Sequence, residues 1–260
     1  MSSRKSLDAL GDRLKTFERL ETDQQFIPNL PIYVRLDGRS FSKFTKGLKR
    51  PYDERLSTLM VETTKYLVKE FNATIGYTQS DEISLILKNI YGKGTVFNGK
   101  KQKLISTLAA SATAYFNSNL SACLPEKSDC LPTFDCRAFN VPNVDEAANC
   151  ILWREQDATK NSILMTGFHY FSFNEMQNKN TKQIREMLLE THNINWEDYP
   201  TFFKYGTYVQ RDIYEKDGVI RSHVLVPDWF DSLKEFEHSG RIQIVMNDYP
   251  EEDLNGADNA

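Results

Sequence analysis

Two short stretches of the chain place acidic residues where an apolar run ends. Residues 33–41 read YVRLDGRSF, and further along the chain reads YTQSDEISLIL, with Asp81 and Glu82 near its middle. Carboxylate oxygens are the protein ligands that Mg²⁺ usually takes, alongside phosphate oxygens. If Asp37 and Asp81 met on neighbouring strands, they could hold two divalent ions for phosphoryl transfer. The alternative is that both are solvated turn residues, because Asp and Gly are common in turns.

A glycine and a basic run follow Asp37 directly. Gly38 lets the backbone approach a ligand closely, and the run RSFSKFTKGLKR contains Arg39, Lys43 and Lys49. Cations beside a metal suit a triphosphate, because the metal alone does not neutralise its charge. The alternative is a solvated basic loop. No P-loop pattern GxxxxGK[ST] occurs, which excludes a Walker-type NTPase.

The spacing of apolar residues predicts the elements that must position these side chains. IYVRLD is typical of a strand, and NATIGYTQSDEISLIL of two strands joined by a hairpin turn at Gln79–Glu82. Helical spacing is found over 53–71, with Asp53 as the predicted N-cap, and over 101–123. FDCRAFNVP predicts a further strand, and a third long helix begins near Asp145. This order predicts an α+β fold, with an antiparallel or mixed sheet and helices packed on one face.

Segments at both ends extend this core. The N-terminal stretch spaces Leu7, Leu10, Leu14 and Phe17 along one stripe of an amphipathic helix. TKQIREMLLE predicts a helix, and two apolar runs around EKDG predict a C-terminal hairpin.

Composition narrows the class of protein. Apolar residues make up 40% and aromatic residues 12% of the chain, which predicts a folded core. No apolar run reaches the roughly 18 residues of a membrane helix. The four cysteines match no CxxC metal pattern, so we expect free thiols and a cytoplasmic protein. The N-terminus lacks a secretory h-region, and acidic residues interrupt the basic character of a mitochondrial presequence, although a mitochondrial location stays open.

The net charge of −4 does not by itself indicate a nucleic-acid-binding protein. The segment after Arg241 contains five of the 36 acidic residues and no basic ones. Without that segment the acidic and basic residues nearly balance, so RNA binding would depend on local basic patches.

Several sequence blocks resemble those of the tRNA(His) guanylyltransferase family, which includes guanylyltransferase-like 3′–5′ RNA polymerases. The blocks are RLDGRSFSKFT, RPYDERL, GYTQSDEISLIL, FDCRAF, WREQDATKNS and HNINWEDYPTFFKYGTYV. They occur in family order over roughly residues 8–215. An ordered set of this length is far more specific than a lone SDE.

The resemblance implies a palm domain like that of ordinary polymerases, which adds nucleotides in the opposite direction. An RNA 5′-monophosphate is activated by attack on the α-phosphate of ATP or GTP, and the 3′-hydroxyl of an incoming nucleotide then attacks the activated 5′-phosphate. Two Mg²⁺ ions serve both steps. The implied metal ligands are Asp37, Gly38 through its carbonyl, and Asp81, with Glu82 beside them as a further catalytic residue.

The resemblance also implies binding residues and partners. Those for the nucleotide are Asp37, Gly38, Arg39, Ser40, Phe41, Ser42, Lys43, Ser80 and Asp81. Candidate RNA or phosphate contacts are Lys49, Arg137, Arg154, Asn161 and Lys204. The expected partners are tRNA and nucleoside triphosphates, with no membrane, and a homotetramer is implied. We divide the chain into a palm-like catalytic region with the N-terminal helix (1–145), a C-terminal extension of the same domain (146–245) and an acidic mobile tail (246–260).

One departure bears on the RNA substrate. The eukaryotic guanylyltransferases have a His-Ile-Asn-Asn run after the WR motif, tied to recognition of the histidine tRNA, and here residues 159–162 read Thr-Lys-Asn-Ser. We therefore favour template-dependent repair of 5′-truncated tRNA, with addition of guanosine at position −1 of tRNA(His) as the alternative. A nucleotide cyclase and a non-catalytic RNA-binding protein are remoter alternatives. The first is disfavoured by the C-terminal blocks and the second by the intact Asp37 and Asp81.

Overall fold

Helices and strands alternate along the chain much as the apolar spacing predicts. The structure is a computed structural model and describes residues 9–88, 96–216 and 219–227. The strands are β1 (Ile32–Gly38), β2 (Ile75–Gln79), β3 (Glu82–Leu87), β4 (Phe134–Asn140), β5 (Thr207–Lys216) and β6 (Val219–Leu225). The α-helices are α1 (Ala9–Thr22), α2 (Phe41–Phe44), α3 (Glu54–Glu70), α4 (Lys101–Cys123), α5 (Val144–Tyr170), α6 (Phe173–Met176), α7 (Thr181–His192) and α8 (Thr201–Tyr205). Short 3₁₀ helices are η2 (Val96–Gly99), η3 (Pro125–Lys127) and η4 (Trp196–Asp198).

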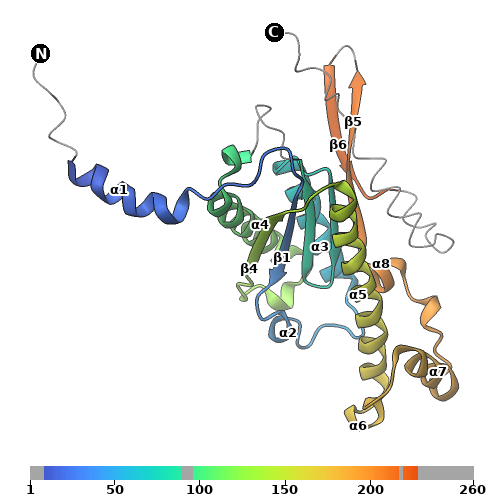
Figure 1. Ribbon diagram of the computed structural model, residues 1–260. Coiled ribbons are helices and arrows are strands. Elements are labelled where there is room, and N and C mark those ends of the chain that lie inside the picture. The colour runs from blue at the N-terminus through green and yellow to red at the C-terminus, as the bar shows by residue number, and fades with distance from the viewer. Residues whose placement is uncertain (1–8, 89–95, 217–218, 228–260) are drawn as a thin grey trace, which may run out of the picture.

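The strands form one six-stranded sheet in the order β4-β1-β3-β2-β5-β6 (Figure 1). Every neighbouring pair is antiparallel. The first four strands follow the chain order strand, helix, two strands, helix, strand, which is the ferredoxin-like arrangement. The predicted α+β class and antiparallel sheet are confirmed.

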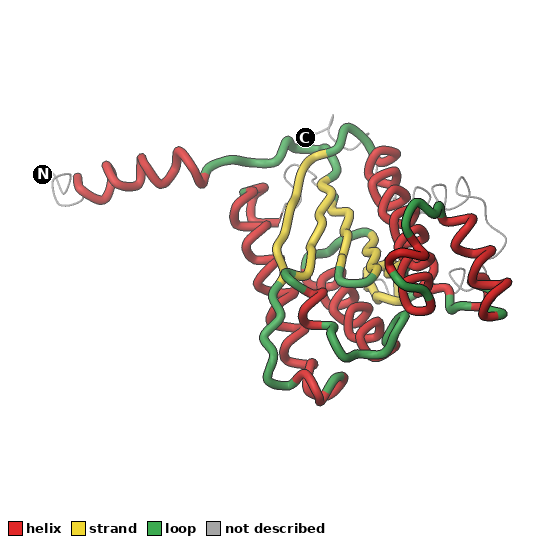
Figure 2. The backbone as a smooth tube through the Cα atoms, turned by 90° about the horizontal axis from the view of Figure 1, so that it is seen from below, coloured by secondary structure: helices red, strands yellow, loops and turns green. Residues whose placement is uncertain are grey.

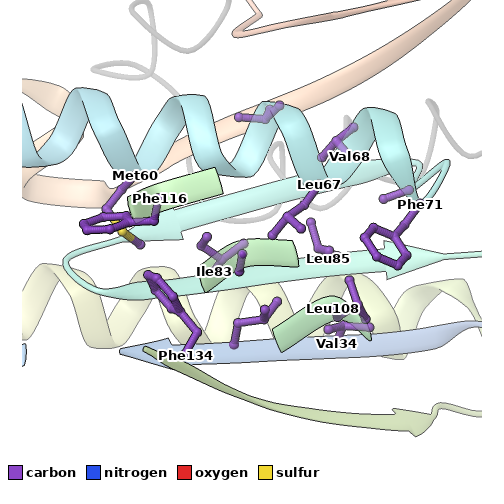
Figure 3. Close-up of a cluster of buried hydrophobic side chains, with 14 of the residues drawn as sticks. Val34, Met60, Leu67, Val68, Phe71, Ile83, Leu85, Leu108, Phe116 and Phe134 are labelled. Carbon is purple, nitrogen blue, oxygen red and sulfur yellow. The ribbon is translucent and has the colours of Figure 1, made fainter. Parts of the chain in front are cut away.

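Helices α3 and α4 cover one face of this sheet and enclose the main core (Figure 3). Alternation along β1 directs Val34 and Leu36 into this core, and both are fully buried. Asp53 caps α3 as predicted, its side chain accepting a hydrogen bond from the backbone N–H of Arg55. Helix α3 lies close to β2 at Gly76, where an added Cβ would stand 2.7 Å from Val68. The glycine therefore sets the distance between helix and sheet.

Helix α5, in the predicted C-terminal extension, covers part of the opposite face. Figure 2 shows helices on both sides of the strands. The first half of α5 packs small side chains, among them Ala147 and Ala148, on the buried rings of Tyr33, Tyr77 and Tyr208. Small residues allow the helix to approach the sheet closely. The sheet face that includes the side chain of Asp37 is thus bordered by α5.

The second half of α5 belongs to a separate small core with α6, α7 and η4. Its buried members are Ile163, Phe171, Met176, Ile184, Leu188 and Trp196. Helix α7, predicted from TKQIREMLLE, begins with a capping box in which Asn180 and Gln183 each accept from the other's backbone N–H. The predicted C-terminal hairpin is confirmed as β5 and β6, while its turn at residues 217–218 lies outside the described residues.

Helix α1 extends away from the rest of the molecule (Figures 1 and 2). Its apolar stripe is not packed against other described parts of the chain, because Leu10, Leu14, Phe17 and Leu20 are all more than half exposed. Leu7 and the predicted acidic tail at 246–260 lie outside the described residues. No helix in the described parts of the chain is both long enough and apolar enough to cross a bilayer.

Candidate active site

The end of β1 and the β2–β3 turn meet at one end of the sheet. Asp37 of β1 lies directly opposite Glu82 of β3, and the backbone N–H of Gly38 donates to the carbonyl oxygen of Asp81 at 3.0 Å. Ser80 adopts a left-handed φ of 50° in the tight turn before Asp81. The predicted hairpin is confirmed, and backbone pairing holds the Asp37 and Asp81 segments together.

Burial and the charge of Asp37 both act on the Asp81 carboxyl. The pKa of the Asp81 carboxyl is raised from its ordinary value of 3.8 to about 6, first by burial and then by the negative charge of Asp37. A hydrogen bond from the side chain of Ser80 opposes the rise only in part. Because the charge of Asp37 disfavours the ionised form of the Asp81 carboxyl, a cation bound beside both would be stabilising.

Glu82, predicted as a further catalytic residue, is engaged in an ion pair. Both of its carboxylate oxygens accept from Arg154 of α5, at 2.6 Å from Nε and 2.8 Å from Nη2. Glu82 is 6% and Arg154 8% exposed. Arg154 also donates to Asp157 at 3.0 Å. The pair therefore anchors α5 to β3 beside the carboxylates, and the structure does not present Arg154, a predicted phosphate contact, to RNA.

The segment after β1 forms a tight loop into the short helix α2. An added Cβ on Gly38 would collide with the ring of Phe41, so a glycine is required here. Ser40 has a left-handed φ of 58° and its side chain does not cap α2. Its carbonyl oxygen accepts from the backbone N–H of Lys43 at 3.0 Å and of Phe44 at 3.3 Å. Arg39, Ser40, Ser42 and Lys43 are exposed.

Phe41, predicted to contact the nucleotide, points into the main core. It is 3% exposed and lies 5.0–5.7 Å, between ring centroids, from Phe44, Phe116 and Phe134. Its side chain therefore anchors the loop to the main core and is not exposed for contact with a nucleotide.

A small cavity of about 80 Å³ lies beside the β2–β3 turn. Ser80 and Gln79 line it from the turn, Asn161 from α5 and Tyr52 from the segment before α3. The structure thus brings together two predicted site residues, Ser80 and Asn161, that are far apart in the chain.

The other predicted RNA contacts lie in different settings. Lys49 and Arg137 are exposed, as a phosphate contact requires. Lys204 is 2% exposed, and its ammonium donates to the carbonyl oxygen of Glu197 at 2.6 Å. Burial therefore makes Lys204 a packing residue of the α8 region, and the structure does not bring it to a surface that RNA could reach.

The chemistry of the donor set fits Mg²⁺. Asp37, Asp81 and the carbonyl of Gly38 offer only oxygen ligands, which that ion prefers, and it would keep further positions for water or phosphate. Across the described residues there is no group of three or more His, Cys, Asp or Glu side chains placed to hold a metal. The candidate site thus depends on two carboxylates and a backbone oxygen.

Two residues near this site were missed by the sequence reasoning. Asp135 of β4 lies directly opposite Asp37, and Arg35 lies opposite Arg137, on the same sheet face. Alternation places Asp135 and Arg137 on one face of β4, and Arg35 and Asp37 on one face of β1. That pattern does not predict that β4 pairs with β1. The four cysteines are free thiols, as predicted.

Comparison with known proteins decides the family. The sequence profile of the tRNAHis guanylyltransferase family matches residues 11–142, which span the chain from α1 to the end of β4. The chain belongs to this family. Its members are nucleotidyltransferases, and the predicted resemblance is confirmed.

Relatives and solved structures extend the match beyond that region. An uncharacterized protein of Acanthamoeba polyphaga mimivirus is 30% identical over 95% of this chain and 92% of its own length. The tRNA(His) guanylyltransferase of Neurospora crassa is 30% identical over 78% of this chain and 73% of its own. A bacterial guanylyltransferase-like protein solved in complex with ATP is 34% identical, with a TM-score of 0.78, covering 91% of this chain and 99% of that one. The same kind of bacterial protein was solved with GTP, at 33% identity and a TM-score of 0.74, covering 94% of this chain and all of that one.

Proposed function

We propose that this member of the family is a 3′–5′ nucleotidyltransferase that repairs the 5′ end of truncated tRNA. The observation that carries the proposal is the meeting of Asp37 and Asp81 at one end of the sheet, where Asp37 contributes to the raised pKa of Asp81. Support for a nucleotide substrate comes from the similar bacterial proteins solved with ATP and with GTP.

The proposed reaction has two steps. An oxygen of the RNA 5′-phosphate attacks the α-phosphorus of ATP or GTP, and pyrophosphate leaves. The 3′-hydroxyl of the incoming nucleotide then attacks the activated 5′-phosphate, and the nucleoside monophosphate leaves. Two Mg²⁺ ions, when bound, would lower the barrier by neutralising charge on the attacking and leaving oxygens.

The residues of the chain have separate roles in this proposal. Asp37 and Asp81 supply carboxylate ligands for the metal, with the Gly38 carbonyl as a third ligand. The exposed cations Arg39 and Lys43 bind the triphosphate. Glu82 does not act directly; its ion pair with Arg154 fixes α5 and β3 beside the carboxylates.

A tRNA panel tests the proposal. Full-length tRNA and tRNA lacking one or two 5′ nucleotides are incubated with labelled nucleoside triphosphates and Mg²⁺. We expect incorporation into the truncated RNAs, and loss of it in Asp37→Ala and Asp81→Ala variants that keep their circular dichroism spectrum. Full incorporation by both variants would refute the assignment of the carboxylates.

Addition of guanosine at position −1 of tRNA(His) is the second candidate. The family takes its name from that activity, and the Neurospora crassa relative has the same name. Within residues 159–162, which replace the His-Ile-Asn-Asn run, Thr159 bonds back to the carbonyl of Glu155 and Ser162 is buried. We therefore expect tRNAs with different anticodons to be repaired at similar rates. A hundredfold preference for tRNA(His) would favour the second candidate instead.

The proposal includes a homotetramer that works in the cytoplasm. The exposed apolar stripe of α1 is a candidate contact between subunits, because its four large side chains have no partner in the described chain. Free thiols fit a reducing compartment. Light scattering after size-exclusion chromatography would test the tetramer, and a monomer of about 30 kDa would contradict it.

A further inference from the structure

Part of the sheet face that includes the side chain of Asp37 is not covered by α5. Strand β4 is the outer strand, next to β1 (Figure 1). Phe139 of β4 is 47% exposed and Trp153 of α5 is 55% exposed. These are large apolar side chains in open positions, whereas most aromatic residues in the described parts of the chain are buried or half-buried.

Two arginines of β1 and β4 lie on the same sheet face as Phe139. Arg35 and Arg137 occupy opposite positions on β1 and β4, and the Arg35 guanidinium lies 5.7 Å from the centroid of the Trp153 ring. Phe139 lies in the next row, 5.5 Å from Tyr33 between ring centroids. We name this surface the arginine–aromatic platform and define it by four residues: Arg35, Arg137, Phe139 and Trp153.

Arg137 makes only a long, exposed ion pair with Asp135. Its guanidinium lies 3.7 Å from a carboxylate oxygen of Asp135, and both side chains are more than half exposed. A surface pair of this kind contributes little, so the arginine can move to a phosphate at small cost. Asp135 is the acidic group facing the platform from the row nearest Asp37.

The platform and the loop at residues 38–43, which we assign to the nucleotide, lie on opposite sides of Asp37 along β1. Along β1, the loop at residues 38–43 follows Asp37, whereas the arginine row precedes it by two residues and the Phe139 row by four. With a strand rise of about 3.3 Å per residue, these rows lie roughly 7 and 13 Å from Asp37. A second substrate that meets the nucleotide at the carboxylates would therefore extend over the platform.

We infer that the arginine–aromatic platform binds the 5′-terminal nucleotides of the RNA substrate. The rings stack on bases and the arginines bind backbone phosphates, a combination that suits nucleic acid strands. This inference rests on the proposed function, since it names the surface that holds the RNA for that reaction. The alternative is that the platform binds a protein partner. In that case the substitutions described below should leave RNA affinity unchanged.

RNA affinity without catalysis is the direct test. A 5′-monophosphorylated tRNA transcript lacking its first nucleotide, labelled at the 3′ end, is titrated with the full chain in EDTA and without nucleotides. We expect Trp153→Leu and Phe139→Leu each to weaken binding by about tenfold. Arg137→Gln should lower the slope of log affinity against log salt by about one. Unchanged affinity in all three variants would overturn the inference.

A matched control separates stacking from general loss of an exposed ring. Phe173 is 70% exposed at the start of α6, beyond the far end of α5 from Trp153, and Phe173→Leu should leave RNA affinity unchanged. An equal loss in Phe173→Leu would also overturn the inference. Thermal unfolding of each variant shows whether it is folded. If Trp153→Leu does not fold, the RNA affinity of Phe139→Leu, a substitution on β4, tests the inference instead.

Two further measurements distinguish RNA binding at the platform from nucleotide binding at the platform and from the proposed function. ATP affinity, measured with Mg²⁺ present, should be the same in Trp153→Leu and the unmodified chain; a parallel loss would assign the platform to the nucleotide and overturn the inference. Binding in EDTA does not depend on chemistry. A chain that binds RNA through the platform but incorporates no nucleotide would therefore refute the proposed function and leave the platform standing.

Discussion

Replacing Asp81 by Asn should stabilise the metal-free protein while it abolishes the response to Mg²⁺. The pKa of Asp81 in the folded protein is raised from 3.8 to about 6 by burial and by the charge of Asp37. The folded state therefore binds the Asp81 proton more tightly than the unfolded chain does. The free energy of unfolding therefore falls as pH rises from about 4 to about 6. Above about pH 6 the protein keeps this whole loss of stability.

The size of the effect follows from the rise in pKa. A rise from 3.8 to about 6 corresponds to about 3 kcal/mol. Asp81 is only partly shielded from solvent, so screening reduces the expected value to about 1–2 kcal/mol. For a chain of this size that raises the unfolding midpoint by roughly 2–8 °C. Asp81→Asn removes the charge at nearly constant volume.

Urea and thermal unfolding in EDTA measure this gain. At about pH 8 the variant should be more stable than the unmodified chain, and at about pH 5 the difference should shrink as Asp81 takes up its proton. With excess Mg²⁺ the order should reverse, because only the unmodified chain keeps both carboxylate ligands. Asp135→Asn is the matched control and should show neither effect. Asp135 is an exposed acidic residue of β4 that lies opposite Asp37. A variant that is less stable in EDTA at about pH 8 would refute the reasoning.

Three further substitutions test the packing around the site. Arg154→Met should destabilise the protein by about 3–5 kcal/mol in urea unfolding, because Glu82 stays buried without its partner; adding Glu82→Gln should restore most of the loss, and no recovery would contradict the ion pair. Gly38→Ala should slow nucleotide incorporation and cost about 1–3 kcal/mol of stability, because the new Cβ collides with the Phe41 ring. Lys204→Met should lower stability by about 1–3 kcal/mol and leave RNA affinity unchanged in a titration; weaker RNA binding with unchanged stability would return this lysine to the RNA contacts.

Local patterns were sufficient for many elements. The Asp53 cap and the apolar spacing after it predicted α3, and the turn at Gln79–Glu82 predicted the β2–β3 hairpin. Both depend on residues that are near one another in the chain, so the information is contained in a few consecutive positions. The resemblance to the family placed Asp37 and Asp81 in one site before any tertiary contact was known.

The sequence by itself determined the elements, the family and the two carboxylates that we assign to the metal. Only the tertiary structure decided the partners: Glu82 is bound by Arg154, 72 positions away, Lys204 is buried, and Asp135 lies beside Asp37. The physical reason is that charge pairing and burial depend on which strands and helices become neighbours. Local periodicity shows which face a side chain occupies but not which distant segment packs against that face.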